Sequence, residues 1–159
     1  MNKVNAILNN YKFKEYLIKN QECEKDRVFC RHNLEHFMDV ARIAYIMVLE
    51  NNIDIEKEII YSAALLHDIG RWKQYIESIP HEKASYELAN DILSECNYMQ
   101  EEKAIILDAI LNHRNEKNEK GTFNYIFYLS DKLSRGCFSC KVQNECKWKK
   151  EKKNLKIIY

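Results

Sequence analysis

Glycine and proline are nearly absent from this chain, with three glycines and one proline among 159 residues. Folds with many tight turns need these residues, so their scarcity favours helices joined by short polar links. The apolar residues recur at the three- and four-residue spacings of amphipathic helices, and no segment shows the alternation of a strand. The sequence therefore predicts an all-α helical bundle that forms a single domain over residues 1–159.

About six main helices are expected. They cover about residues 3–20, 26–50, 54–66, 80–96, 99–114 and 122–135. The third is capped by Asp54, and its second half, through Leu66, is apolar all round, so we expect it at the centre of the bundle. Gly70 is expected to take the left-handed position just past this helix. The basic tail is expected to form a short helix or a frayed end.

The charge and the terminal segments exclude several classes of protein. The net charge of +1 gives no general attraction to nucleic acid or membranes. The amino-terminal residues carry charges throughout and lack a small-residue cleavage site, and no uncharged run approaches the length of a membrane span. We therefore expect a cytoplasmic protein with no membrane partner, in which the six cysteines are thiols or metal ligands rather than disulfides.

The histidines are His32, His36, His67, His81 and His113. A single histidine on an apolar helical face is more often a hydrogen-bonded core residue than a ligand. Here His36, His67 and His113 each continue a core-facing stripe, as does Asp131, and Asp68 follows His67 directly. Burying these imidazoles and carboxylates without partners would be costly. A divalent cation binds both groups, so the set favours a metal site.

Four of these residues stand in the order of a known signature. His36 in HFMDVARIA, His67–Asp68 in LLHDIG and Asp131 in LSDKLSR follow the pattern H…HD…D. With them the chain resembles the HD superfamily of metal-dependent phosphohydrolases over about residues 30–136. The HD core is expected to cover about residues 26–136, and a basic, cysteine-containing extension to occupy residues 137–159.

The resemblance implies a ligand set. His36, His67, Asp68 and Asp131 would bind one metal ion. His81 in PHEKAS and His113 in AILNHR look like the two further histidines of dinuclear members such as dinucleoside-tetraphosphate hydrolases, in which Asp68 would bridge two ions. The ions implied are one or two of iron, manganese, nickel, cobalt, magnesium or zinc.

Two reactions known in the superfamily are less favoured. The chain lacks the GYP tripeptide of the HD-GYP cyclic-dinucleotide phosphodiesterases, and Arg114 stands where their second adjacent histidine is expected. It also lacks the Glu-Asp pair that usually follows the doublet in guanosine tetraphosphate hydrolases. The resemblance thus implies an enzyme that hydrolyses a phosphomonoester, phosphoanhydride or phosphodiester of a small, nucleotide-like molecule.

Catalytic roles are expected for His67 and Asp68, beside metal ions that lower the pKa of a water molecule. Cationic donors to the phosphate are expected at Lys132 and Arg135, with Arg71 and Arg114 as further candidates, although each could be a solvated surface charge. His32 would assist the ligands or contact phosphate. The alternative is a catalytically inactive metal-binding HD domain that serves as a nucleotide sensor or interaction module.

The extension contains Cys137, Cys140 and Cys146 in a C-x2-C-x5-C pattern. A structural zinc needs four ligands. Cys30 could supply the fourth, since it lies six residues before His36 and Cys137 lies six after Asp131, which places both on the same side if those helices are antiparallel. Reduced thiols without a ligand role are the favoured interpretation, a structural zinc is the alternative, and an iron–sulfur cluster is less favoured still.

The end of the chain is basic. Residues 141–159 contain seven lysines against two glutamates, with Trp148 among them. Lysines with an aromatic residue can bind a phosphate backbone. A short charged tail is more often simply solvated, so nucleic acid is not favoured as a partner. The expected partner is a small phosphorylated molecule.

Overall fold

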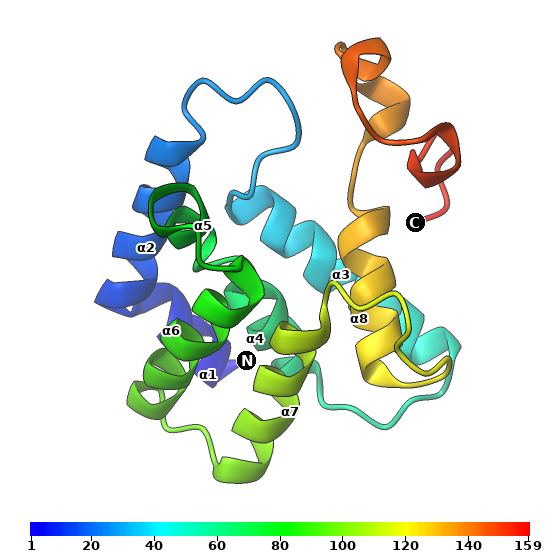
Figure 1. Cartoon of the computed structure of the whole chain (residues 1–159). Coiled ribbons are helices and arrows are strands. Elements are labelled where there is room, and N and C mark those ends of the chain that lie inside the picture. The colour runs from blue at the N-terminus through cyan, green and yellow to red at the C-terminus, as the bar shows by residue number, and fades with distance from the viewer.

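The computed structural model describes residues 1–159 and contains helices but no strand, as Figure 1 shows. The α-helices are α1 (Asn2–Asn9), α2 (Tyr11–Cys23), α3 (Leu34–Glu50), α4 (Lys57–Leu66), α5 (Arg71–Glu77), α6 (His81–Glu95), α7 (Gln100–Asn112) and α8 (Phe123–Leu133). Three 3-10 helices follow, η1 (Cys137–Ser139), η2 (Gln143–Glu145) and η3 (Lys150–Lys152). The all-α prediction is confirmed, and eight α-helices are close to the six expected.

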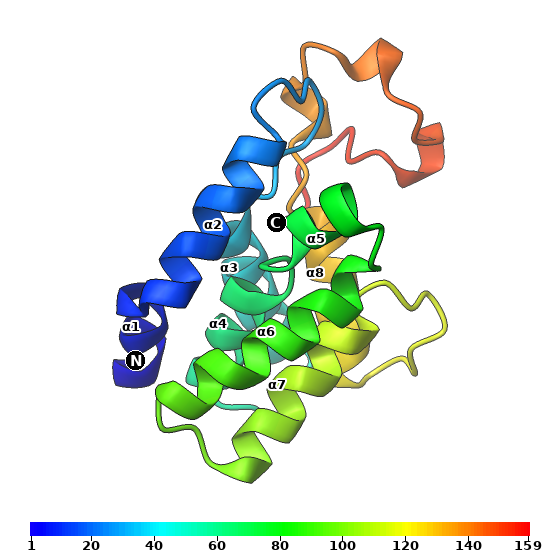
Figure 2. The same cartoon turned by 60° about the vertical axis from the view of Figure 1, so that its left-hand side comes forward.

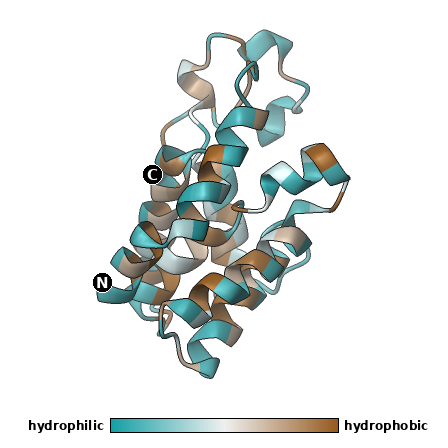
Figure 3. Cartoon of the chain, turned by 90° about the vertical axis from the view of Figure 1, so that its left-hand side faces the viewer, coloured by the Kyte–Doolittle hydropathy of each residue, from teal (hydrophilic) through white to brown (hydrophobic).

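Helix α4 is the centre of the bundle, as its apolar composition predicted. Ile59, Ile60 and every residue from Ser62 to Leu66 are buried. The helix packs against α1, α3 and α7, while α8 lies along α3 and α6 lies along α7 (Figures 1 and 2). Around the turns of these helices hydrophobic and hydrophilic residues alternate (Figure 3), which is the pattern of amphipathic helices that share one core. None of the helices combines the length and the apolar composition that crossing a membrane requires.

The first two expected helices are shorter than the sequence pattern suggested. The segment 3–20 divides into α1 and α2 at Asn10, whose side chain accepts hydrogen bonds from the backbone N–H groups of Lys12 and Phe13 at 2.8 and 3.2 Å. This is an N-cap, and the extended backbone of Asn10 interrupts the helix. Likewise α3 begins at Leu34 rather than near residue 26, because Asn33 caps it by accepting the N–H of His36 at 3.0 Å.

Two details around α4 correct the sequence analysis. The helix begins after Glu56 rather than at a cap on Asp54. Gly70 is not left-handed, since its φ is −92°, and it leads directly into α5, a helix that was not expected. Glycine is required there by space: a Cβ atom on Gly70 would lie 2.5 Å from the backbone nitrogen of Ser85 and 2.6 Å from the carbonyl carbon of Ala84. The turn after α4 therefore packs directly on the backbone of α6.

The carboxy-terminal extension returns to the bundle (Figures 1 and 2). The side-chain Nδ2 of Asn154 donates to the carbonyl oxygens of Lys132, Leu133 and Arg135 at 2.7, 3.1 and 3.0 Å. These carbonyls belong to the last turn of α8 and the residues after it, where a helix leaves acceptors without partners. The tail thus contains one short 3-10 helix, η3, and the segment after it caps α8 rather than fraying.

Candidate metal centre

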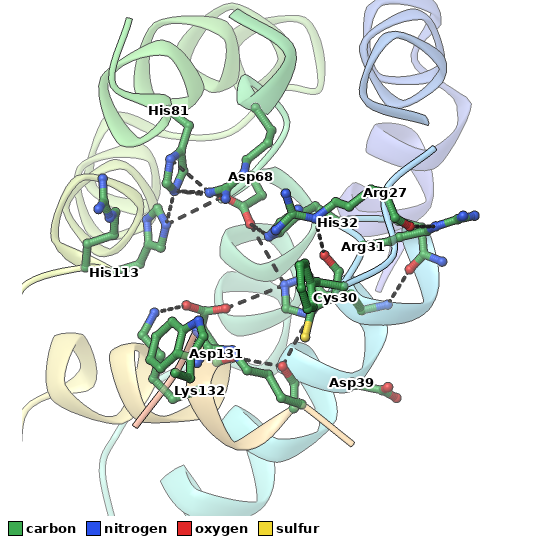
Figure 4. Close-up of a pocket in the computed structure, with 18 of the residues that line it drawn as sticks. Arg27, Cys30, Arg31, His32, Asp39, Asp68, His81, His113, Asp131 and Lys132 are labelled. Atoms are coloured by element: carbon green, nitrogen blue, oxygen red, sulfur yellow. Dashed lines mark hydrogen bonds and ion pairs between the residues drawn. The ribbon is translucent and has the colours of Figure 1, made fainter. Parts of the chain in front are cut away.

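Five of the six residues expected to bind metal line one pocket (Figure 4), and Nε2 of the sixth, His67, lies 3.4 Å from Oδ2 of Asp68. They come from five places in the fold. His36 is in the first turn of α3, His67 and Asp68 directly follow α4, His81 begins α6, His113 follows α7, and Asp131 is in the last turn of α8. Five of the six are buried, and the side chain of His36 is only 13% exposed. Segments far apart in sequence therefore present nitrogen and oxygen atoms to the same small volume.

Asp68 stands between two groups of imidazoles. Its Oδ2 lies 3.4 Å from Nε2 of His67 and 3.9 Å from Nε2 of His36. Its Oδ1 lies 3.1 Å from Nε2 of His81 and 3.6 Å from Nε2 of His113. In each group the ligand atoms lie within 4.8 Å of one another. One carboxylate thus offers one oxygen to each of two candidate cation positions.

Asp131 belongs to the first of these groups by distance. Its Oδ1 lies 3.6 Å from Nε2 of His36 and 4.0 Å from Nε2 of His67. Its other oxygen forms an ion pair with Lys132. In Figure 4 Asp131 lies across the pocket from Asp68. Two carboxylates and two imidazoles therefore surround the first position, whereas the second has one carboxylate oxygen and two imidazoles.

Backbone contacts orient the two histidines that follow helices. Nδ1 of His67 lies 2.8 Å from the carbonyl oxygen of Ala64, and Nδ1 of His113 lies 2.6 Å from that of Ile110. A carbonyl oxygen only accepts, so each Nδ1 must carry a proton, and each ring in its neutral form presents the lone pair of Nε2 toward Asp68. Both contacts use a carbonyl at the end of a helix, which has no partner within the helix.

The turn that carries Asp68 is held by a buried side chain. Asn20 on α2 is fully buried, donates to the carbonyl oxygen of Asp68 at 2.9 Å and accepts the N–H of Trp72 at 2.7 Å. On the other side of the turn the N–H of Gly70 donates to Oγ of Ser85 at 2.9 Å. The doublet is thereby fixed from both α2 and α6.

Several buried polar atoms in the pocket have no hydrogen-bond partner. They include Nε2 of His36, Nε2 of His67 and Oδ1 of Asp68. Nε2 of His113 faces Nε2 of His81 at 3.1 Å, and Nε2 of His81 lies 3.0 Å from the donor Nη1 of Arg71. Buried polar atoms without a hydrogen-bond partner are costly. A divalent cation would satisfy them, so the donor set fits a metal.

The protonation states agree with this interpretation. Burial lowers the pKa of His36 to about 3, of His113 to about 4 and of His81 to about 2, so all three are neutral ligands at pH 7. Burial also opposes a charge on His67, but the nearby carboxylates of Asp68 and Asp131 outweigh it and raise its pKa. The pKa of Asp68 is held well below its ordinary value, against the effect of burial, by the surrounding histidines. Of these four histidines, only His67 would have to lose a proton before it could bind a cation.

His32 forms a buried pair with Glu24, which the sequence analysis missed. Glu24 is 3% exposed and accepts both the backbone N–H of His32, at 2.7 Å, and the hydroxyl of Tyr75, at 2.6 Å. Nδ1 of His32 lies 2.5 Å from the same carboxylate, and its Nε2 lies 3.7 Å from Oδ2 of Asp68. Against the effect of burial, His32 and Tyr75 lower the pKa of Glu24 to about 2.

The ligands open into a cavity of about 690 Å³. All four cationic residues proposed from the sequence line it, and three more do so that were not proposed. These seven residues are Arg27, Arg31, Arg71, Arg114, Lys132, Arg135 and Lys147. Nη1 of Arg71 lies 3.0 Å from Nε2 of His81 and 3.8 Å from Oδ1 of Asp68. The rim can therefore receive a strongly anionic molecule next to the candidate metal positions.

The extra cationic residues and Glu24 had no signal in the sequence. Glu24, Arg27 and Arg31 lie in residues 24–33, which form a loop, although the part from about residue 26 was expected to be helical. The loop is closed by Nε of Arg27 on the carbonyl oxygen of Cys30, at 2.7 Å. Only this folding back places the segment over the pocket.

The cysteines do not form a group of the kind seen at the histidines. Cys30 and Cys146 line the cavity, but no cysteine belongs to either group of ligand atoms within 4.8 Å. The helical geometry that suggested Cys30 as a fourth ligand does not apply, since Cys30 lies in the loop before α3 and Cys137 begins η1. A zinc site formed by Cys30, Cys137, Cys140 and Cys146 stays a prediction.

Comparison with known proteins adds two findings. The family model described as HD domain matches residues 33–136. A protein from Clostridium beijerinckii that is described as an uncharacterized protein is 50% identical over 159 residues, which is 100% of both chains. No solved structure matches this chain. The similarity to this relative thus includes residues 137–159, which the family model does not match.

Proposed function

This chain belongs to the HD-domain family, and from that premise we propose that it is a metal-dependent phosphohydrolase acting on a small, nucleotide-like phosphate compound. The observation that carries the proposal is the position of Asp68. Its two carboxylate oxygens face separate pairs of imidazole nitrogens at the floor of a cavity with a cationic rim. Such a site would hold two cations and a phosphate group side by side.

The residues divide the task of binding cations. His36, His67, Asp68 and Asp131 would hold one ion, while His81 and His113 would hold the second together with Asp68. When bound, such ions supply Lewis-acid stabilisation of phosphoryl oxygens and lower the pKa of water to near neutrality. The neutral histidines at pH 7 favour this loading, because no proton has to leave His36, His81 or His113 first.

The cationic rim would orient the substrate. Arg71 is next to Asp68, Lys132 is next to Asp131, and Arg114 follows His113. Each can donate hydrogen bonds to a phosphate oxygen and offset the charge that develops there during transfer. Arg114 is now paired with Glu82 at 3.1 Å and Lys132 with Asp131, so substrate binding would exchange these partners for phosphate.

The pair of Glu24 and His32 suits proton transfer to the leaving group. The carboxylate of Glu24 accepts a hydrogen bond from Nδ1 of His32. Nε2 of the same ring then faces the cavity, 3.7 Å from Oδ2 of Asp68, where it can take up or release a proton. Tyr75 and the backbone N–H of His32 hold the carboxylate in place. We propose that His32 protonates the leaving oxygen and that Glu24 positions it.

The test is phosphate release from a panel of nucleotides, dinucleoside polyphosphates, cyclic dinucleotides and phosphomonoesters, with Mn²⁺ or Fe²⁺ added. We expect metal-dependent turnover of at least one class. Asp68→Asn should reduce turnover by more than about 100-fold and lower the number of metal atoms per chain by elemental analysis. Asp91→Asn removes an exposed carboxylate of α6 and is the matched control.

Two results would contradict the proposal. Full activity and full metal content in Asp68→Asn would rule out this site. Metal and nucleotide binding without turnover on any substrate would favour the inactive sensor instead.

A further inference from the structure

Trp148 lines the cavity although it lies outside the part of the chain that the family model matches. It is reached from the last turn of α8 through η1 and η2, and its neighbours Cys146 and Lys147 line the cavity as well. Trp148 is 42% exposed, so a large apolar ring faces solvent beside a polar site. The proposed hydrolysis does not use this residue.

A cation holds the ring in place. The guanidinium carbon of Arg135 lies 3.9 Å from the centroid of the Trp148 ring, which is a cation–π contact. Nη1 of Arg135 is buried and has no hydrogen-bond partner. A buried guanidinium donor without an acceptor is costly, and Arg135 also lines the cavity. The pair therefore combines a flat aromatic surface with a hydrogen-bond donor that lacks its acceptor.

The segment that carries Trp148 is anchored on both sides. Before it, Nε2 of Gln143 donates to the carbonyl oxygen of Cys137 at 2.6 Å. After it, Nζ of Lys152 pairs with Glu116 at 2.6 Å, and Asn154 caps the end of α8. The extension thus forms a closed loop that starts and ends at α8 (Figure 2). The place of Trp148 at the cavity is set by these contacts, and the ring does not hang on a free tail.

We propose that Trp148 and Arg135 bind the base of a nucleotide whose phosphate lies at the histidine–aspartate cluster. The inference rests on the proposed function and names its substrate class. A planar base would stack on the indole ring and cover surface that is now exposed, while Nη1 of Arg135 would donate to a base or phosphate oxygen. Stacking accepts any base, because every base has a π-face. The cavity volume of about 690 Å³ is within the range of small-molecule sites.

A phosphorylated sugar without a base is the competing ligand. It would bind through the cationic rim and gain nothing from Trp148. The two classes are separated by the methylenephosphonate analogues of adenosine monophosphate and ribose 5-phosphate, which resist hydrolysis and differ only in the base. Binding of each analogue is measured by calorimetry on the full chain in the presence of Mn²⁺.

Wild-type protein should bind the adenosine analogue more tightly than the ribose analogue. Trp148→Ala should weaken the adenosine analogue by roughly 5-fold to 100-fold and leave the ribose analogue unchanged. Trp148→Phe should restore most of the loss. Phe138→Ala is the matched control, since it removes an aromatic residue of the same extension that is 50% exposed and does not line the cavity.

Equal affinity for the two analogues in the wild type, or equal effects of Trp148→Ala on both, would overturn the inference. The proposed function fails separately. Base-selective binding without phosphate release from any substrate would retain the nucleotide site and reject the hydrolase. Phosphate release with no base-selective effect of Trp148→Ala would do the reverse.

Discussion

At the scale of single residues, the site depends on buried polar atoms that have no hydrogen-bond partner. They are Nε2 of His36, Nε2 of His67 and Oδ1 of Asp68. The proton on Nδ1 of His67 is held by a backbone carbonyl, as is that of His113. Their Nε2 atoms are thereby prepared for a cation and cannot turn away to find another partner.

Glu24→Gln tests the role of the carboxylate behind His32. The amide keeps the size of the side chain but accepts less strongly from Nδ1, so His32 loses its fixed orientation toward the cavity. We expect a fall in kcat of about 10- to 100-fold, with the metal content unchanged. The pH profile of kcat should shift as well, which a purely structural role would not cause.

Glu22→Gln changes an exposed glutamate in the last turn of α2, two residues before Glu24, and is the control. Unchanged kcat and an unchanged pH profile in Glu24→Gln would contradict the role of Glu24 as the residue that positions His32.

The histidines predict how stability depends on pH in metal-free protein. His36, His81 and His113 have folded-state pKa values of about 3, 2 and 4, below the unfolded value of 6.5. As pH falls below 6.5, the histidines of the unfolded chain become protonated, whereas these buried rings stay neutral in the folded state. The free energy of unfolding therefore decreases by about 1.4 kcal/mol per pH unit for each proton that only the unfolded chain binds. His67 acts in the opposite sense, since its raised pKa stabilises below 6.5 and that contribution is lost as pH rises through the folded value.

Urea unfolding of chelator-treated protein at pH 7.5 and pH 5 measures this dependence. The denaturation midpoint should be lower at pH 5. In His113→Gln the denaturation midpoint should depend less on pH, because one of the rings that stay neutral in the folded state has been removed. An identical dependence in wild type and His113→Gln would show that His113 is not held neutral.

At the scale of elements, the ligands are carried by the ends of helices. His67 and His113 follow α4 and α7, His81 begins α6, and His36 and Asp131 lie in terminal turns. Helix ends have backbone groups without partners, and here these groups orient the imidazoles. The site is thus built where several helices end against one another, and its geometry depends on how closely these ends approach.

Gly70→Ala tests that approach. A Cβ atom would meet the backbone of α6 at 2.5 and 2.6 Å, and backbone atoms cannot move aside as a flexible side chain can. We expect a loss of unfolding free energy of about 1–3 kcal/mol in urea titrations, together with weaker metal retention because Asp68 is displaced. Gly136→Ala is the control, since its Cβ would meet only Oγ of Ser139 at 3.5 Å. Equal stability of the two variants would show that α6 is not packed this tightly.

At the scale of the whole molecule, the candidate metal centre joins segments that the hydrophobic core joins independently. The core consists of 30 buried hydrophobic residues and includes residues of α1, α3, α4, α6, α7 and α8. The ligands come from five places in the same bundle. The bundle can therefore persist without metal, whereas metal binding should add to its stability by linkage.

Removing metal with a chelator should lower Tm. The far-ultraviolet circular dichroism at 25 °C should still show the signal of a helical protein. Returning Mn²⁺ at a hundredfold excess over its Kd should restore about 2.7 kcal/mol of stability. Asp68→Asn should show a much smaller response to the metal. A loss of helical signal on chelation would mean that the core alone does not hold the fold.

By itself, the sequence determined the helical class, the central position of α4 and the residue types of the candidate metal site. These follow from apolar spacing and from the chemistry of imidazole and carboxylate, which are local properties of the chain. The order of His36, His67–Asp68 and Asp131 was enough to indicate the family, because the residues recur in a set order along the chain.

Only the tertiary structure decided how these residues meet. The division of the Asp68 oxygens between two pairs of histidines, the burial of Glu24 against His32 and the contact of Gly70 with α6 all join segments that are distant in sequence. The return of the extension that brings Trp148 to the cavity is of the same kind. Distances between such segments are set by how the helices pack, and residue spacing along the chain does not encode them.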